Sequence, residues 1–394
     1  ANGFITITAA GNITVGDVNA GSQAVTLTAD NAGNTAMIVD DAQDNIVDIT
    51  GGTMTLTADA GIGQPDGTGG GTLDVSASTL NLNGGGGAIN VVQYANVILN
   101  ATNAIGDIVV GVNGDVFIDS ATALTGNIHI TATGAILSAD IDPETELLGT
   151  LVDLNAGTGI GTDAGGAVGI TATTILVDST NGNVNIDSLA TGAVTVATLT
   201  TGTGDITFQQ TNGYAVTVTM ATTTNGDIIL KNDAGTLTAT TVNAGGAGSD
   251  VSLTTTTSGD VVVDSITAND QIAISSAGAI QASAADAGAE LTAAILDLNA
   301  ATGIGTGVPG ALDTAAQSIW ADSTTGNVDM DNDSATAVSV GSLTTATGDI
   351  TFDQTGGGSL TVTNAQTTTD GNIALGNAGN SLTVSSRMIS GSDT

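Results

Sequence analysis

Residues Asp153–Thr162 read DLNAGTGIGT, and residues Asp297–Thr306 read DLNAATGIGT, 144 residues further along the chain. The same offset relates VDSTNGNVNID at Val177–Asp187 to ADSTTGNVDMD at Ala321–Asp331, and it holds without a gap from Leu151 to Thr219. A fixed internal period indicates one structural unit stacked on itself, in which each unit contacts only its neighbours. The sequence therefore predicts a repeat architecture.

A shorter motif lies inside the long repeat: Gly, then Asp or Asn, then Ile or Val, any residue, and an apolar residue. After the glycine the side chains alternate, so that Val184 and Ile186 face one way and Asn183 and Asn185 the other. This pattern is typical of a turn followed by a short half-buried strand. The motif begins at Gly11, Gly106, Gly114, Gly126, Gly182, Gly204, Gly226, Gly259, Gly326, Gly348 and Gly371.

The spacing of the motif predicts the fold. Copies at Gly182, Gly204 and Gly226 are 22 residues apart, too short for a propeller blade of about 40–50 residues. Hydrophobic residues make up 41% of the chain but aromatic residues only 2%, and the 56 glycines contrast with three prolines, as many short strands and tight turns require. We expect an all-β fold, a single-stranded parallel β-helix (β-solenoid) with coils of about 22 residues.

The repeats also predict the organisation of the chain, as one continuous solenoid over residues 1–394. The string Gly61–Gly63 returns at Gly159–Gly161, 98 residues later, whereas Gly114 matches Gly259 at an offset of 145. We therefore expect three units, at about 16–113, 114–258 and 259–394, and the first unit is shorter than the second by two coils. Because the chain begins with Ala1 and the last unit stops short of a full period, we expect a piece of a longer array.

Charge and composition exclude several classes of function. There are 39 acidic residues and two basic ones, which gives a net charge of −37, and there is no cysteine. Without a basic patch, nucleic-acid binding is not expected, and an anionic membrane surface would repel the chain. No apolar stretch approaches the roughly 20 residues of a membrane span. Disulfides and thiol chemistry are excluded.

Stacked Asp residues at the corners could bind calcium, although solvated carboxylates in glycine turns are the simpler interpretation. Two strings resemble calcium loops. Asp250 ends GGAGSD, the start of a calcium β-roll motif, and Asp329, Asp331 and Asp333 have the spacing of an EF-hand loop, but Ser334 replaces the required glycine. We expect no cofactor, with these aspartates as weak calcium candidates. Residues 139–147 (ADIDPETEL) interrupt the pattern, as SAADAGAEL does at 283–291, and predict a surface loop.

Catalytic chemistry is poorly supplied, and we predict that the chain is not an enzyme. Sugar hydrolases need paired carboxylates and usually aromatic platforms, whereas Trp320 and Tyr214 lie alone in the repeat and indicate packing variants. His129 falls on the outward phase of a strand, which predicts a solvent-facing imidazole rather than a member of a triad. Phe208 and Phe352 fall on the inward phase, and Phe117 on the opposite one.

The units GDITF, GNITV, GDVFI and GNVNI, with their Ala/Thr/Gly-rich surroundings, resemble the shafts of filamentous-haemagglutinin-like adhesins and other large β-strand-repeat proteins of bacterial surfaces. The resemblance covers nearly the whole chain. It implies a right-handed parallel β-helix, export, and a role as a stalk, fibre or adhesin. It carries over no functional residue.

Together these observations predict a non-enzymatic extracellular protein at the cell surface that forms a fibre, sheath or adhesin shaft. Its expected partners are further coils, supplied by other copies or by a longer chain, and cell-surface or matrix glycans. The alternatives are a carbohydrate-active β-helix, either a hydrolase or a lyase, and a glycan-binding adhesin tip.

Overall fold

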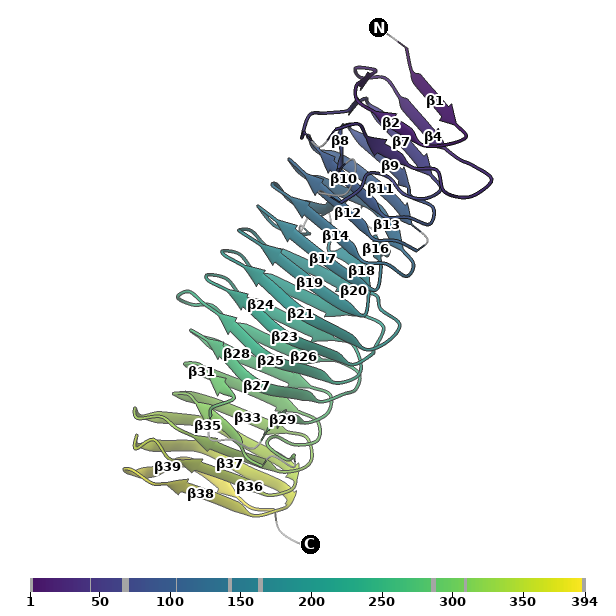
Figure 1. Ribbon diagram of the computed structural model, residues 1–394. Coiled ribbons are helices and arrows are strands. Elements are labelled where there is room, and N and C mark those ends of the chain that lie inside the picture. The colour runs from purple at the N-terminus through teal and green to yellow at the C-terminus, as the bar shows by residue number, and fades with distance from the viewer. Residues whose placement is uncertain are drawn as a thin grey trace. The chain divides into compact units, whose positions relative to one another are not determined.

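The computed structural model describes residues 3–42, 44–65, 71–103, 105–140, 144–161, 166–284, 288–307 and 310–391. Over these ranges the chain forms only strands, bridges and turns, without a helix, and its strands pair in parallel (Figure 1). Successive coils stack at a regular interval, so that Ile206 pairs with Ile228, 22 residues later. The predicted β-solenoid is confirmed. The chain divides into two compact units, Ala1–Ala190 and Thr191–Thr394.

The first unit contains short strands of two to eight residues. They are β1 (Ile5–Ala9), β2 (Ile13–Val15), β3 (Val18–Asn19), β4 (Val25–Ala29), β5 (Ile38–Asp40), β6 (Ile49–Thr50), β7 (Thr53–Ala58), β8 (Leu73–Ser76), β9 (Thr79–Asn83), β10 (Ile89–Gln93), β11 (Val97–Asn103), β12 (Ile108–Val112), β13 (Val116–Ala123), β14 (Ile128–Ala132), β15 (Ile136–Ser138), β16 (Leu147–Leu148), β17 (Leu151–Ala156), β18 (Val168–Thr171), β19 (Thr174–Ser179) and β20 (Val184–Ser188).

The second unit continues the same pattern with somewhat longer strands. They are β21 (Val194–Thr201), β22 (Ile206–Gln210), β23 (Val216–Thr223), β24 (Ile228–Asn232), β25 (Leu237–Ala244), β26 (Val251–Thr255), β27 (Val261–Ala268), β28 (Gln271–Ser276), β29 (Ile280–Ala282), β30 (Leu291–Thr292), β31 (Ile295–Ala300), β32 (Leu312–Ala315), β33 (Ser318–Ser323), β34 (Val328–Asn332), β35 (Val338–Thr347), β36 (Ile350–Gln354), β37 (Leu360–Asp370), β38 (Ile373–Asn377) and β39 (Leu382–Ile389).

Each coil contributes strands to two sheets. In the first unit β1, β4, β7, β9, β11 and β13 pair in succession as the β1 sheet, and β8, β10, β12, β14, β17 and β19 pair as the β8 sheet. In the second unit the β22 sheet runs from β22 through β24, β26, β28, β31, β33, β35 and β37 to β39. The β21 sheet starts with β21, β23, β25 and β27.

The core lies between the two sheets, where alternate side chains of each strand meet. In β24, Ile228 and Leu230 are fully buried, whereas Ile229 between them is 43% exposed. Phe208 and Phe352 are fully buried and Phe117 is only partly covered, as the phase of the motif predicted. Burying one such aliphatic or aromatic side chain contributes about 1.5–3 kcal/mol, so the repeated interior supplies most of the stabilising free energy.

The repeated Gly-Ile-Gly string forms a one-residue strand at a tight corner. Ile160 makes isolated parallel bridges to Ile136 and Val184, and it is fully buried. Gly161 has a φ of 65°, a left-handed conformation that glycine adopts without strain, and a Cβ there would overlap the carbonyl oxygen of Asn185. The strings around Ile62 and Ile304 repeat this geometry, with φ values of 65° at Gly63 and 67° at Gly305.

The long repeat does not span a whole number of coils. In the second unit the GDITF motif at Gly204–Phe208 leads into β22, and its copy at Gly348–Phe352 leads into β36. Six pairing steps lead from β22 to β35 in the β22 sheet, and β36 then lies in the opposite sheet, paired with β34. The 144-residue repeat therefore covers six and a half coils, and equivalent strands face opposite sides.

The same half-coil step occurs in the first unit. Ile62 bridges β5 and β10 on one side, and its counterpart Ile160, 98 residues later, bridges β15 and β20 on the other. Four steps through β10, β12, β14 and β17 separate them before the change of side. The shorter offset therefore spans four and a half coils.

Candidate functional site

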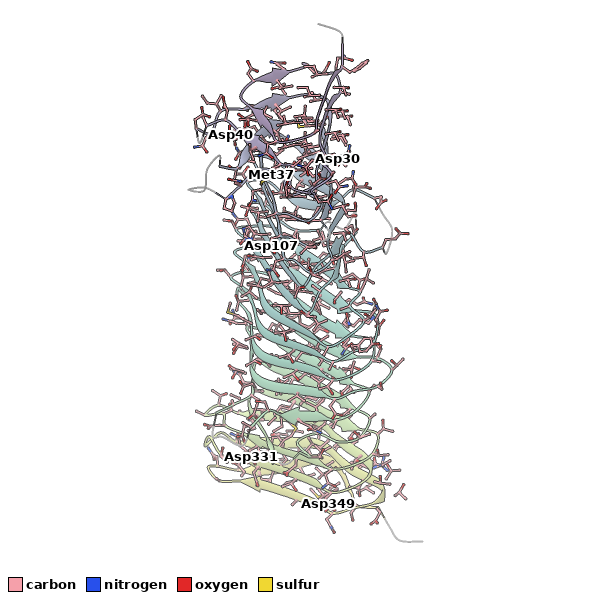
Figure 2. The ribbon with its side chains drawn as sticks, turned by 45° about the vertical axis from the view of Figure 1, so that its right-hand side comes forward. Asp30, Met37, Asp40, Asp107, Asp331 and Asp349 are labelled. Carbon is pink, nitrogen blue, oxygen red and sulfur yellow. The ribbon has the colours of Figure 1, made fainter. Side chains whose placement is uncertain are left out.

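The Gly-Asx corners form a hydrogen-bonded ladder, which we call the corner ladder. The Oδ1 atom of Asp205 accepts the backbone N–H of Asp227 at 2.9 Å, and Oδ1 of Asp227 accepts the N–H of Asp250 at 2.9 Å. A short side chain reaches the next coil in this way, which explains why Asp and Asn follow the corner glycine. The same contact joins Asp107 to Asn127, Asp115 to Ala135, Asp260 to Ala279, Asn327 to Asp349, and Asp349 to Asn372; Figure 2 labels Asp107 and Asp349.

The calcium candidate Asp250 belongs to the corner ladder. Its Oδ1 atom accepts the N–H of Gln271 at 3.0 Å, in addition to the bond that its own N–H makes with Asp227. The preceding Ser249 donates its hydroxyl to the carbonyl of Gly245 at 2.6 Å, which closes the glycine-rich turn. The GGAGSD string thus serves the corner of a coil, where one carboxylate oxygen is already used by the backbone.

The candidates Asp329, Asp331 and Asp333 lie on and just after strand β34. Asp329 and Asp331 point outward, because the buried Val328, Met330 and Asn332 alternate with them. Burial raises the pKa of Asp329, and the nearby Asp331 and Asp353 raise it further. Burial and then Asp353 likewise raise the pKa of Asp331, which Figure 2 labels.

Three aspartates in register make this face an acidic stripe. Asp331 is in register with Asp313 on β32 and with Asp353 on β36, so the three aspartates lie on neighbouring strands about 4.8 Å apart. A hollow of about 400 Å³ opens beside them. The carboxylates come from three strands rather than from one loop, unlike the EF-hand arrangement that the spacing suggested. The hollow is lined by Ala289, Asp313, Thr314, Ala315, Asp331, Asp333 and Thr355.

A second acidic group lies at the break between β5 and β6. The carboxylate oxygens of Asp40, Asp41 and Asp48 come within 4.8 Å of one another, and Asp40 (labelled in Figure 2) and Asp48 are buried. Burial raises the pKa of Asp48 to about 7; the N–H of Asp74, bonded to Oδ2 at 3.0 Å, lowers it, and Asp40 raises it. In the part of the chain that the structure describes, these three carboxylates are the ones placed closely enough to hold a divalent cation.

The interruption between β5 and β6 recurs in the other two copies of the repeat, each time with a buried acidic residue in the place of Asp48 but with different hydrogen-bond partners. In the second copy Glu146, which is 3% exposed, accepts the N–H of Gly169 at 2.5 Å and the hydroxyl of Ser138 at 2.7 Å. In the third copy Glu290 accepts the N–H of Asp313 at 2.7 Å. A buried acid at Asp48, Glu146 and Glu290 thus anchors the end of the broken strand to the next coil.

The predicted surface loop over residues 139–147 ends in two buried residues, Glu146 and Leu147. Glu144 is exposed, as expected. Residues 141–143 and the counterpart Asp286 lie outside the described residues. Asp40, Asp41 and Asp48 were not predicted as a site from the sequence, although residues 40–48 of the first repeat match residues 138–146 of the second at the offset of 98.

His129 points outward, as the phase of its strand predicted, and it has a partner in the next coil. Its Nδ1 atom lies 2.8 Å from Oδ2 of Asp153, the residue in register with it on β17. Its Nε2 atom lies 3.3 Å from the hydroxyl of Thr131. Asp153 also accepts the side-chain amide of Asn155 at 2.9 Å. The imidazole therefore lies within a polar chain and is not a solitary surface group.

The isolated aromatic residues are only partly covered. Tyr214 is 43% exposed and Trp320 is 41% exposed. The indole of Trp320 lies against Gly341 of β35, where any Cβ would meet its Nε1 atom. Trp320 thus packs over a glycine on the outer face, consistent with its interpretation as a packing variant.

Within the described ranges the chain has no helical segment with the length and apolar character of a membrane crossing. Comparison with protein-family models, with curated proteins and with solved structures gave no match.

Proposed function

We propose that this chain is a structural β-solenoid on the outside of a cell, where it forms the shaft of a fibre, a sheath or an adhesin. Its main partners in this role are further coils of the same kind, from other copies or from a longer chain. Glycans of the cell surface or matrix are the second class of partner. The observation that carries the proposal is the uncovered last coil of the second unit.

Among the described residues, which end at 391, no further coil covers the side chains of the last strand. Strand β39 pairs with β37, and its Leu382, Val384 and Met388 are 43%, 43% and 46% exposed. Their register partners on β37, Leu360, Val362 and Ala365, are fully buried. A strand edge of this kind is a template for pairing with another strand, and its apolar side chains favour association.

The first coil of the first unit has a similar edge. Strand β1 pairs with β4 through Ile5 and Val25, and Ile7 is 36% exposed although its partner Leu27 is fully buried. Phe4, just before the strand, is 77% exposed. A further coil placed over either edge would extend the backbone ladder and cover this apolar surface.

The rest of the surface supports a durable extracellular role. Lys231 and Arg387 are the only Lys and Arg residues in the sequence, which leaves few sites for proteases of trypsin specificity. The net charge of −37 opposes lateral aggregation, so association is favoured at the open strand edges rather than along the sides. Surface labelling of intact producing cells with an antibody against this chain tests the location.

The assembly itself is tested by electron microscopy and analytical ultracentrifugation of the purified chain over a range of concentrations. We expect end-joined particles whose mass grows with concentration. Val384→Glu places a charge on the open edge and should reduce assembly at least tenfold. Ile229→Glu is the matched control, because Ile229 has the same 43% exposure but lies on an outer face within the stack.

Two results would contradict the proposal of self-assembly. One is a wild-type chain that stays monomeric at all concentrations. The other is an equal loss of assembly in the Val384→Glu and Ile229→Glu variants, because that would show a general effect of charge rather than a role of the strand edge.

A further inference from the structure

The polar chain around His129 has the connectivity of a hydroxyl–imidazole–carboxylate relay. The carboxylate of Asp153 can only accept, so the 2.8 Å contact places the imidazole proton on Nδ1. Nε2 is then the free acceptor, and the hydroxyl of Thr131 lies 3.3 Å from it. A nucleophile beside a base that a third group orients is the arrangement that activates serine and threonine hydroxyls.

The register of the strands holds this relay in place. His129 and Thr131 lie two residues apart on β14, so both point outward while Ile128, Ile130 and Ala132 are buried. Asp153 stands opposite His129 on β17. Asn155 donates to Oδ1 of Asp153 at 2.9 Å, which fixes the second oxygen of the carboxylate.

The relay is open to solvent beside a hollow. The His129 side chain is 42% exposed, so a ligand can reach it. The hollow is an open depression with a volume of about 370 Å³. Thr131 and Asn155 lie on its wall, which continues to Asp178 on the following coil.

The second unit contains the same frame without the imidazole. At the 144-residue offset, Asp297 and Asn299 repeat Asp153 and Asn155, and Asn299 donates to Asp297 at 2.8 Å. Ala273 is in register with Asp297, where the first unit has His129. Ser275 stands in the place of Thr131. The carboxylate–amide pair is therefore a feature of the coil, and the base is specific to one copy.

We propose that Thr131 and His129 form an acyl-transfer site for small acyl esters, with Asp153 as a positioning residue. This activity goes beyond the structural role proposed above and does not depend on it. Thr131 Oγ1 attacks the ester carbonyl carbon, and its proton passes to His129 Nε2. The bond to the leaving alkoxide then breaks, and the same proton passes to that oxygen, which releases an alcohol and leaves an ester on Thr131. Water, deprotonated by His129, attacks this ester, releases the carboxylic acid and restores the hydroxyl.

The test uses the full chain with p-nitrophenyl acetate, following p-nitrophenolate release and mapping acetylated residues by mass spectrometry. We expect acetylation of Thr131, and a loss of about a hundredfold in rate for His129→Ala, a typical contribution of a general base. Thr131→Val should lose the activity to the same extent. Thr217→Val, an exposed threonine on β23, is the matched control and should keep the full rate.

Two further variants distinguish the relay from a merely structural contact. Asp153→Asn should move the imidazole proton to Nε2, which nitrogen NMR of His129 detects directly, and slow the reaction. Ala273→His should add a second relay with Ser275 and raise the rate above that of the wild type. Wild-type rate in Thr131→Val, which would mean that His129 reacts alone, or acetylation of Thr131 no greater than that of Thr217, would overturn the proposal; thermal unfolding verifies that each variant is folded.

Discussion

Asp227 accepts the backbone N–H of Asp250 through Oδ1 at 2.9 Å and donates its own N–H to Asp205 at the same distance. Each carboxylate of the corner ladder thus closes the gap between one coil and the next. Two negative charges separated by about 4.8 Å, the spacing of stacked coils, repel one another by about 1 kcal/mol even in water. The hydrogen bond to a backbone donor offsets this repulsion, since a bond to a charged acceptor contributes about 1.5–3 kcal/mol.

We predict that Asp227→Ala will destabilise the second unit by about 1.5–3 kcal/mol, because the N–H of Asp250 loses its acceptor. Asp227→Asn keeps an Oδ1 acceptor and removes one charge, so it should be close to neutral. Hydrogen exchange at the Asp250 amide, together with urea unfolding, measures both effects. Equal exchange rates in the Ala and Asn variants would contradict the role of the ladder.

The pKa of about 7 at Asp48 predicts a pH-dependent first unit. Since the folded-state pKa lies above the ordinary value of 3.8, the fold binds the proton more tightly than the unfolded chain does. The stabilisation is full below pH 3.8 and is lost as the pH rises through about 7. Protection factors of the β5 and β6 amides, which correct hydrogen exchange for its intrinsic acceleration with pH, should therefore fall between pH 4 and 8.

Asp40→Ser tests the cause of this pH dependence, because the second copy has Ser138 at that place, hydrogen-bonded to Glu146. The change removes the like charge beside Asp48, lowers its pKa and should flatten the profile of protection factors against pH. Asp30→Asn, at an exposed position, serves as the control and should leave the profile unchanged. An unchanged profile in Asp40→Ser would show that the Asp40 carboxylate does not contribute to the raised pKa of Asp48.

In the acidic stripe we predict that Asp353→Asn will lower the pKa values of both Asp329 and Asp331, because the Asp353 carboxylate raises both. Titration of the side-chain carboxyl carbons by NMR gives the values directly. Asp370→Asn, on β37 of the other sheet, should change neither. If both pKa values stay the same in Asp353→Asn, burial accounts for them without the neighbouring charge.

The Gly-Ile-Gly corner should not tolerate a side chain. Gly63→Ala puts a Cβ at a φ of 65°, into the carbonyl oxygen of Asn90, so we expect a loss of more than about 1–2 kcal/mol. Gly192→Ala is the matched control, since a Cβ there meets no atom within 4 Å and its φ is not left-handed. Urea unfolding of the two variants compares them, and similar midpoints would contradict this account.

The fold could be predicted because short stretches of sequence reveal both the length of a coil and which side chains of each strand face the core. The 22-residue spacing of the glycine corners gives the coil, and the alternation around Val184 and Ile186 gives the buried face, which the structure confirms. The half-coil step could not be read in the same way. A residue offset of 144 reports similarity, whereas the side on which Phe352 lies depends on how many strands intervene between it and Phe208.

The polar groups were harder to predict because their partners come from other coils. Asp48 meets Asp74 and Asp40 across a broken strand, whose irregular length hides the register. The contact of His129 with Asp153 was within reach, because the two lie 24 residues apart, about one coil, on the same outward phase. The contact was not predicted because the sequence does not give the exact register of two neighbouring coils.

The half-coil step also bears on how such a chain can evolve. When a gene segment encoding six and a half windings is duplicated, the copy is rotated by half a turn about the axis of the stack. Side chains that lie on one face of the parent segment then lie on the opposite face of the copy. Elongation by this route yields a two-sided molecule from a one-sided ancestor, without any new surface having to be invented.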